Sequence, residues 1–368
     1  RKALISLQAI PSLPPDLACQ LMNWYHAGTR SLPWPSDPRP YYVWLSEIML
    51  QQTRVEAASP YFERFIRELP TIADLAAAPE QQLLKLWEGL GYYNRVRNLQ
   101  RAAQIVVDTY SGELPADFEL LLQLPGVGRY SAGAIASIAF GLPVPAVDGN
   151  VLRVLSRVLE SPAPIDREET KRQMGVAISR QLPPDRPGDF NQALMELGAM
   201  VCLPNGAPRC EVCPLCPLCL AHHNGTISEY PRKAPKKARR CETRTVLVLF
   251  RRGEVAIRQR PATGLLRGLW ELPNLEGALT PEEIRKLLAD WGLSAGYPIA
   301  LGEARHIFTH LEWQMTGWAV AVEGEPVQPL LFVPPEQLRE EFCLPSAFHA
   351  YADRIPGLIK ELQYDNHS

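Results

Sequence analysis

The sequence predicts a mostly α-helical N-terminal region followed by a smaller α/β (α+β) domain. Up to about residue 222, apolar residues recur at helical spacing and are divided by Pro and Gly turns. Strand-like runs begin at Thr245. A length of 368 residues accommodates two or three domains at roughly 100–200 residues each. The hydrophobic content of 46% is sufficient for buried cores.

The N-terminal region, placed at residues 1–222, is expected to contain several separate helices. Periodic apolar stretches mark each of them, and Pro or Gly turns separate one from the next. The expected helices lie at 42–55, 80–86, 98–109, 117–124, 130–140 and 150–159.

A different pattern defines the C-terminal domain, placed at residues 245–368. Apolar runs with a Gly253 turn between the first two predict strands, and a periodic stretch after Thr280, a good N-cap residue, predicts a helix. The expected elements are strands at 245–250, 254–258 and 313–322 and a helix at 281–291. No internal repeat is evident.

A basic segment at 223–244 separates the two regions. The whole chain has a net charge of -2, made up of -2 over residues 1–222, +5 over 223–245 and -5 over 246–368. This Pro-rich, basic segment suits an extended linker that follows a DNA backbone or serves only as a solvated tether. DNA binding therefore stays open, because local patches can supply it despite the negative total.

The composition argues against a membrane protein. The mean hydropathy is -0.13, and no run approaches the roughly 18 apolar residues of a membrane span. The N-terminal residues lack the apolar run of a secretory signal. We therefore expect a soluble, monomeric, intracellular protein of the cytoplasm or nucleoid, with no membrane partner.

Five of the eight cysteines fall within eighteen residues, at Cys202, Cys210, Cys213, Cys216 and Cys219. This spacing, in a chain without a secretion signal, favours metal binding over disulfides. Four thiolates could hold a zinc ion, or they could hold an iron–sulfur cluster. The run from Cys210 to Cys219, with two residues between successive cysteines, resembles that of bacterial ferredoxins.

Two glycines, Gly126 and Gly128, flank Val127 in a turn between two expected helices. Such a turn exposes backbone N–H groups at the start of the next helix, which binds phosphate without a positive side chain. A plain packing turn is the alternative. Further along, Asp148 precedes another helix, where it can act as the N-cap and, still ionised, face a developing positive charge.

Six sequence motifs carry a family resemblance. They are Leu-Pro-Gly-Val-Gly at 124–128, Val-Asp-Gly-Asn at 147–150, the cysteine cluster, Arg-Ser-Leu-Pro-Trp at 30–34, Glu-Ile-Met-Leu-Gln-Gln-Thr-Arg-Val at 47–55 and Trp-Glu-Gly-Leu-Gly-Tyr-Tyr at 87–93. Together they resemble the helix-hairpin-helix DNA glycosylases and, among these, the adenine-specific MutY family. The resemblance implies a helix-hairpin-helix at about 117–140 that binds phosphate through residues 126–128, and an iron–sulfur loop at 202–219.

Adenine release needs an acid that protonates the departing base and an anion that faces the oxocarbenium-like sugar. Glu47 lies among apolar residues that would raise its pKa, although a surface Glu on an amphipathic helix is the ordinary alternative. The resemblance implies that Glu47 is the general acid and that Asp148 stabilises the oxocarbenium ion or briefly bonds to the sugar. By the same resemblance, Tyr130 and Asn150 assist. Tyr130 stands where endonuclease III enzymes carry a nucleophilic Lys, so we expect no efficient lyase activity.

The target base must leave the duplex before it can be cut. By resemblance, the residues near the disturbed base stack are Gln52, Thr53, Leu90 and Tyr92. By the same resemblance, the adenine pocket is lined by Arg30, Leu32, Trp34 and Gln192. Core packing is the alternative for Leu90 and Trp34. Pro35 departs from the family, which often has a basic residue after this Trp, and this puts a phosphate contact there in doubt.

The family holds a [4Fe–4S] cluster with C-x6-C-x2-C-x5-C spacing. Here Cys202, Cys210, Cys213 and Cys219 give gaps of seven, two and five residues, with the extra residue in a Pro- and Gly-containing loop. The resemblance implies that these four ligate a [4Fe–4S] cofactor of structural role. Cys216 is then an extra thiol.

Residues 264–273 resemble the start of a Nudix hydrolase motif, but residues 281–288 do not supply its acidic continuation. Without those carboxylates, Mg²⁺-dependent hydrolysis has no ligands. We therefore expect a Nudix-like 8-oxoguanine recognition domain, which by resemblance uses Phe308, Thr309 and His310. The family usually has Ser in the middle, and Thr keeps the hydroxyl. An ordinary strand-edge loop is the alternative.

These features predict a monofunctional glycosylase of base excision repair that removes adenine opposite 8-oxoguanine, and also from A·G, in double-stranded DNA. Two alternatives remain. One is a mismatch glycosylase of other base preference, such as thymine from G·T, against which the Nudix-like domain argues. The other is a non-catalytic DNA-binding iron–sulfur protein, in which Glu47 and Asp148 would be incidental.

Overall fold

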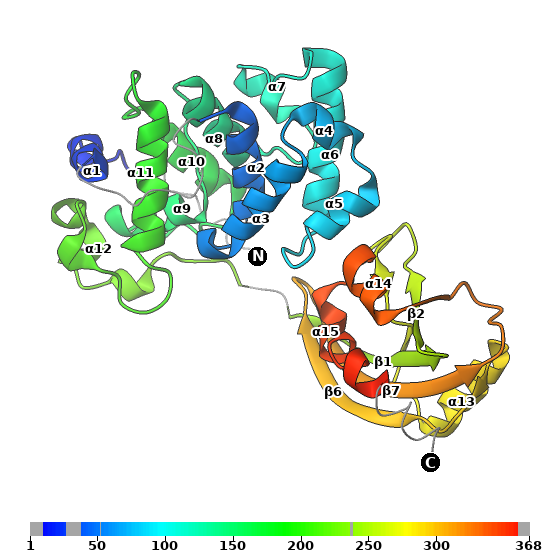
Figure 1. The fold of residues 1–368 in the computed structure, drawn as a ribbon. Coiled ribbons are helices and arrows are strands. Elements are labelled where there is room, and N and C mark those ends of the chain that lie inside the picture. The colour runs from blue at the N-terminus through cyan, green and yellow to red at the C-terminus, as the bar shows by residue number, and fades with distance from the viewer. Residues whose placement is uncertain (1–9, 27–37, 52, 236–237, 360–368) are drawn as a thin grey trace, which may run out of the picture. The chain divides into compact units, whose positions relative to one another are not determined.

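The computed structural model describes residues 10–26, 38–51, 53–235 and 238–359. The chain divides into two compact units, one formed by Arg1–Ala78 and Arg97–Lys236 and the other by Pro79–Val96 and Lys237–Ser368. The first unit is helical and the second contains a β-sheet, so the expected fold class is confirmed (Figure 1).

Helices account for the regular structure before residue 230. The α-helices are α1 (Leu17–His26), α2 (Pro40–Leu50), α3 (Val55–Glu68), α4 (Ile72–Ala77), α5 (Glu80–Leu86), α6 (Asn94–Tyr110), α7 (Phe118–Leu122), α8 (Arg129–Ala134), α9 (Gly149–Val158), α10 (Glu168–Ser179), α11 (Pro187–Met200) and α12 (Leu220–His223). The shorter helices are the π-helical η1 (Ile135–Ala139) and the 3-10 turns η2 (Cys210–Val212), η3 (Cys216–Leu218) and η4 (Ile227–Glu229). The helix expected at 42–55 ends at Leu50, and that expected at 130–140 is divided into α8 and η1.

The core of the helical unit surrounds α9. Its apolar side chains pack with those of α1, α10 and α11, and the buried cluster includes Leu17, Leu21, Val151, Leu155, Met174, Phe190, Leu194 and Leu197. Gly198 lets α11 approach α9 closely, because a Cβ there would lie 2.6 Å from Cβ of Asn150. This packing fixes the N-terminal end of α9, which carries Asp148 and Asn150.

The sheet of the second unit is built around two parallel strands. Its strands are β1 (Arg240–Arg251), β2 (Glu254–Gln259), β3 (Trp270–Glu271), β4 (Asn274–Glu276), β5 (Ser294–Ala295), β6 (Ile299–Ile307), β7 (Leu311–Glu323) and β8 (Leu331–Val333). β1 pairs in parallel with β7, and the other pairings are antiparallel. Successive residues of β1 face opposite sides: Val246 and Val248 enter one core, Leu247 and Leu249 the other. Burial of both faces explains why this run is continuously apolar.

Helices cover both faces of the sheet (Figure 1). Leu338 of α14 (Pro335–Glu341) and Tyr351 of α15 (His349–Ala352) lie in one core, and α13 (Pro281–Asp290) contributes to the other. As expected, Thr280 caps α13, and its hydroxyl and the Glu283 carboxylate form a capping box. A 3-10 turn, η5 (Ser346–Phe348), precedes α15.

Part of the segment expected to be a linker is tied to the helical unit. The Ile165 N–H donates to the Arg232 carbonyl at 3.0 Å, and the Ala234 N–H donates to the Asp166 carboxylate at 3.0 Å. At the other end of the segment, β1 already begins at Arg240 because its backbone pairs with β7. Among the described residues, none of the helices combines the length and the apolarity that crossing a bilayer requires.

Candidate active site

Glu47 lies on α2 and is buried. Pro40 occupies the first turn of α2, and residues 43–49 are all buried, so this helix is surrounded by apolar packing. The exposed fraction of Glu47 is 7%, which excludes the surface position that an amphipathic helix would give it. The pKa of Glu47 is raised to about 7. Burial is the main cause of this rise and the charge of Asp148 adds to it, whereas the hydrogen bond from Tyr130 opposes it.

Tyr130 follows the glycine turn and faces Glu47. It is the second residue of α8, and its hydroxyl donates a hydrogen bond to Glu47 Oε2 and lies 3.8 Å from Sδ of Met195. Burial, together with the charges of Glu47 and Asp148, raises the pKa of Tyr130 well above its usual value. The phenol therefore stays protonated and is a fixed hydrogen-bond donor to Glu47.

Asp148 is the N-cap of α9, as expected. Its Oδ1 accepts a hydrogen bond from the Val151 N–H at 2.7 Å, and its Oδ2 accepts one from the Asn150 amide at 2.8 Å. Burial is the larger influence and raises the pKa of Asp148, although these hydrogen bonds and the charge of Arg153 lower it in part. The two carboxyl groups therefore have different partners. A cation and two N–H donors favour the ionised form of Asp148, whereas the hydrogen-bond donor to Glu47 is a neutral phenol.

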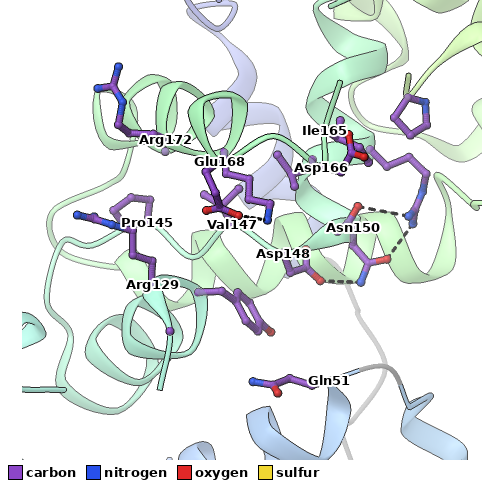
Figure 2. Close-up of a pocket in the computed structure, with 18 of the residues that line it drawn as sticks. Gln51, Arg129, Pro145, Val147, Asp148, Asn150, Ile165, Asp166, Glu168 and Arg172 are labelled. Atoms are coloured by element: carbon purple, nitrogen blue, oxygen red, sulfur yellow. Dashed lines mark hydrogen bonds and ion pairs between the residues drawn. The ribbon is translucent and has the colours of Figure 1, made fainter. Parts of the chain in front are cut away.

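Arg153, one turn further along α9, holds the Asn150 side chain. Its Nη2 donates to Asn150 Oδ1 and to the Gly198 carbonyl, both at 2.8 Å, and its Nε donates to the Cys202 carbonyl at 2.8 Å. Because the Asn150 oxygen is engaged in this way, its NH₂ points to Asp148 (Figure 2). Arg153 carries no signal of this role in the sequence, because an Arg on an amphipathic helix is usually solvated.

One cavity of about 1010 Å³ brings together the four expected catalytic residues and two of the expected base-contacting residues. Its lining includes Thr53, Glu47, Tyr130, Asp148, Asn150 and Gln192. Tyr25 of α1 also lines it and donates a hydrogen bond from its hydroxyl to Gln192 Oε1 at 2.8 Å. Sequence reasoning missed Tyr25, because an aromatic residue at helical spacing reads as core. Arg30, Leu32, Trp34 and Gln52 lie outside the described residues.

A second, larger cavity of about 1760 Å³ adjoins the same carboxylate and is shown in Figure 2. Asp148, Asn150 and Tyr130 line both cavities. The larger one also contains the glycine turn and a set of basic side chains, which are Arg54, Arg129, Arg153, Arg157, Lys171, Arg172 and Lys233. Asp166, Glu168 and Glu169 lie among them, so positive charge predominates without being uniform.

The two glycines of the turn have different surroundings. Gly126 has φ +78, and a Cβ there would lie 2.8 Å from Cβ of Asn98, so this position needs glycine for packing. Gly128 is the N-cap of α8, and a Cβ there would meet no atom within 4 Å. Val127 between them is buried. The turn therefore packs on one side and is open at the start of α8.

The turn after α5 presents one aromatic ring to solvent. Leu90 is buried, which favours its core-packing alternative, whereas Tyr92 is 52% exposed and has φ +50. Arg95 supports the turn by donating to the carbonyls of Leu90 and Gly91 at 3.0 and 3.3 Å, and its guanidinium lies 5.4 Å from the centroid of the Tyr92 ring. Tyr92 is thus held outward in a sparsely populated backbone conformation.

All five clustered cysteines line one small cavity with Val154, Leu197 and Leu215. Cys202 Sγ accepts a hydrogen bond from Arg157 Nη1 at 3.1 Å, and Cys216 Sγ lies 3.4 Å from Nδ1 of His222. In the part of the chain that the structure describes, no three His, Cys, Asp or Glu side chains converge as they would on a single metal ion. Thiolates are the ligands that iron–sulfur clusters take, so the donor set around this cavity fits such a group.

The expected recognition loop joins β6 to β7. Phe308 is half-buried, and its ring centroid lies 5.0 Å from that of Trp313 and 4.6 Å from that of His306. Thr309 and His310 are exposed at the tip. Phe308 thus anchors a hairpin whose next two side chains are available for contact.

The chain matches two known families. Residues 45–180 match the model described as HhH-GPD superfamily base excision DNA repair protein, and residues 245–354 match the NUDIX domain. Together with the buried carboxyl groups, these matches define the class: a helix-hairpin-helix DNA glycosylase that carries a Nudix-like domain.

Similar proteins specify the family within that class. The adenine DNA glycosylase of Homo sapiens is 36% identical over 407 residues, which covers 92% of this chain and 74% of that protein. The adenine DNA glycosylase of Rattus norvegicus is 37% identical over 365 residues, covering 83% and 70%. A solved thermostable thymine-DNA glycosylase is 26% identical with a TM-score of 0.51, covering 56% of this chain and 95% of that one. The chain belongs to the MutY-type adenine DNA glycosylases, which confirms the resemblance seen in its sequence.

Proposed function

We propose that this protein is a monofunctional glycosylase that hydrolyses the N-glycosidic bond of adenine opposite 8-oxoguanine, and also in A·G, in double-stranded DNA. It acts in base excision repair as an intracellular monomer. The observation that carries the proposal is the pair of carboxyl groups of buried Glu47 and half-buried Asp148, which line one cavity in different electrostatic surroundings.

The two carboxyl groups divide the chemistry. Glu47, with a pKa raised to about 7, is the general acid and transfers its proton to a ring nitrogen of the adenine. The C1′–N bond breaks, and its electron pair leaves with the base. Water then adds to C1′ of the sugar and loses a proton to solvent. Asp148 accepts hydrogen bonds from N–H donors and is stabilised as an anion by the charge of Arg153. It is therefore the group that stabilises the oxocarbenium ion.

Tyr130 and Asn150 assist as positioning groups. The Tyr130 hydroxyl holds the Glu47 carboxyl, and the Asn150 amide holds Asp148. Tyr130 occupies the place of the lysine that attacks the sugar in bifunctional relatives, and a phenol cannot form a Schiff base. We therefore infer that the product is an abasic site and that strand cleavage does not follow.

DNA binding is proposed at the larger cavity. Its basic side chains and the glycine turn at residues 126–128, whose backbone is open at Gly128, suit a phosphodiester chain. A target base must be flipped to reach Glu47, and the exposed ring of Tyr92 is suited to stack in the opened duplex. By the family resemblance, Gln52 and Thr53 are also proposed to contact the disturbed base stack. Gln192, with Arg30, Leu32 and Trp34, is proposed to read the adenine.

We propose that Cys202, Cys210, Cys213 and Cys219 hold a [4Fe–4S] cluster. Members of this glycosylase family typically carry one, and the thiols surround a cavity with an apolar lining. When bound, the cluster would tie the loop that contains Cys210, Cys213 and Cys219 to Cys202 at the end of α11, and so have a structural role. Cys216 is placed outside the ligand set because His222 lies beside its sulfur.

The Nudix-like domain is proposed to recognise 8-oxoguanine through Phe308, Thr309 and His310. The exposed Thr309 hydroxyl and His310 ring offer hydrogen-bonding groups, and Phe308 anchors their hairpin. The acidic residues at the start of α13 do not supply a hydrolase metal site, because Glu283 is engaged in the capping box. Recognition without hydrolysis is therefore the function proposed for this domain.

The test uses a labelled duplex with one adenine opposite 8-oxoguanine, beside A·G, A·T and G·T duplexes. Strand cleavage is measured after enzyme treatment, with and without hot alkali. Alkali-dependent cleavage at adenine, strongest opposite 8-oxoguanine, is the expected result. Cleavage only at G·T would overturn the base preference, cleavage without alkali would overturn the monofunctional chemistry, and no cleavage by cluster-loaded protein would overturn the enzyme itself.

A further inference from the structure

The Gln192 side chain in the candidate adenine pocket has two chemically different ends. Its amide oxygen only accepts hydrogen bonds, whereas its NH₂ only donates them. The two ends are nearly the same size, so the shape of the pocket cannot by itself decide which of them faces a bound base. Some other group must fix the amide if the pocket is to read one base edge rather than the complementary one.

Tyr25 is the group placed to do this. Its hydroxyl donates to Gln192 Oε1 at 2.8 Å, and both side chains line the cavity that contains Glu47 and Asp148. Because Oε1 of Gln192 accepts this hydrogen bond, the NH₂ group of the same amide is the end that faces the cavity. The opposite amide orientation would exchange this bond for one from the amide N–H to the phenol oxygen, and it would turn Oε1 toward the cavity.

The surroundings keep the Tyr25 hydroxyl protonated, so that it has a hydrogen to donate to Gln192. Tyr25 on α1 faces α11, where Asp189, Gln192 and Glu196 are spaced three and four residues apart and share one side of the helix. Burial, with the charges of Asp189 and Glu196, raises the pKa of Tyr25 to about 12. The phenol is therefore protonated at every pH at which the protein works.

We propose that Tyr25 is a positioning residue that fixes the Gln192 amide with its NH₂ toward the bound base, and so sets the base preference of the pocket. This inference rests on the proposed function of the site. An NH₂ group in that place matches a purine whose ring nitrogen is an acceptor, as N1 of adenine is. It opposes hypoxanthine and guanine, in which N1 carries a hydrogen. The second lone pair of Oε1 can still accept from an exocyclic amino group.

The test compares base release from duplexes with adenine or hypoxanthine opposite 8-oxoguanine, in single turnover, for cluster-loaded wild-type protein and Tyr25→Phe. The substitution removes only the hydroxyl, so the amide is free to turn. We expect the adenine-to-hypoxanthine rate ratio to fall about five- to tenfold, the worth of one well-placed hydrogen bond. Tyr61→Phe on α3, outside the described cavities, removes a hydroxyl elsewhere and should leave the ratio unchanged.

Gln192→Glu supplies the decisive background. A carboxylate has two equivalent oxygens and no orientation to fix, so adding Tyr25→Phe to Gln192→Glu should change the rate ratio less than twofold. Equal loss of rate on both bases in the Tyr25→Phe single variant would overturn the inference and leave Tyr25 a packing residue. A change of ratio in the Gln192→Glu background as large as that in the wild-type background would also overturn it. Failure of the wild-type protein to release adenine would instead overturn the proposed function, so the two failures are distinguishable.

Discussion

Two buried glutamates, one in each unit, have opposite surroundings. Glu47 in the helical unit is 7% exposed and accepts a hydrogen bond from the neutral phenol of Tyr130. Glu271 on β3 is 2% exposed, and its carboxylate is bonded to Arg258 at 2.8 Å and to Arg260. The two side chains are thus about equally buried and differ in their partners.

The partners decide what each carboxyl group can do. A carboxylate between two guanidinium groups is stabilised as an anion, and Glu271 thereby ties β3 to β2. A carboxyl group that faces a phenol and a second carboxylate favours its neutral form and has a proton to give. Burial alone therefore does not identify a catalytic acid, and the absence or presence of an adjoining cation among the described residues separates the two cases.

The largest effect is expected at Glu47. Glu47→Gln keeps the size of the side chain and a partner for Tyr130 but removes the proton donor. We expect adenine release in single turnover to slow about a thousandfold, within the range for a general acid. Binding to the same duplex, measured by gel shift, should not change. Glu113→Gln, an exposed glutamate of the same unit, is the matched control. A variant that keeps more than a tenth of the wild-type rate would remove Glu47 from the mechanism.

A structural effect is expected at Glu271. Glu271→Gln leaves the half-buried Arg258 and Arg260 without their carboxylate, and the lost charged hydrogen bonds cost about 2 kcal/mol. Hydrogen exchange of the full-length protein is measured on peptides from β2 and β3. The free energy of opening of these strands should fall by that amount, so their amides should exchange faster. Glu276→Gln, at an exposed position of β4, is the control and should exchange like the wild type. Equal exchange in the two variants would mean that the arginines do not depend on the charge of Glu271.

Much of the fold is local in origin and therefore predictable. The Thr280 cap, the N-cap at Asp148 and the apolar run of β1 depend on neighbouring residues and are found where expected. Breaks that depend on tertiary contacts were missed. The helix expected at 130–140 becomes π-helical from Ile135, where Gly188 of α11 lies so close that a Cβ would be 2.7 Å from the Ser137 carbonyl. β6 was missed because most of its residues are exposed, so it lacks an apolar pattern.

The site was predictable only in part for the same reason. The apolar neighbours of Glu47 indicate its burial, but its contact with Tyr130 joins residues 83 positions apart. The roles given to these residues came from the family resemblance and remain predictions. Tyr25 acts on Gln192 through a hydrogen bond between helices, and Arg153 holds Asn150 while it is itself anchored to α11, which no sequence pattern indicates.

The smallest effect concerns pH, and it tests the protonation of Glu47 without any substrate. The pKa of Glu47 is about 7 in the folded chain against 4.5 for an ordinary glutamate. Between these values the folded state keeps a proton that the unfolded state has lost, so stability falls as pH rises through this window. Gln does not titrate, so Glu47→Gln does not lose stability in this way. Its free energy of unfolding should therefore rise by about 2 kcal/mol relative to that of the wild type between pH 5 and pH 8. Thermal unfolding at both pH values measures the difference, with Glu113→Gln as control. An equal response of wild type and Glu47→Gln would mean that this carboxyl is ionised when buried, and the contrast with Glu271 would disappear.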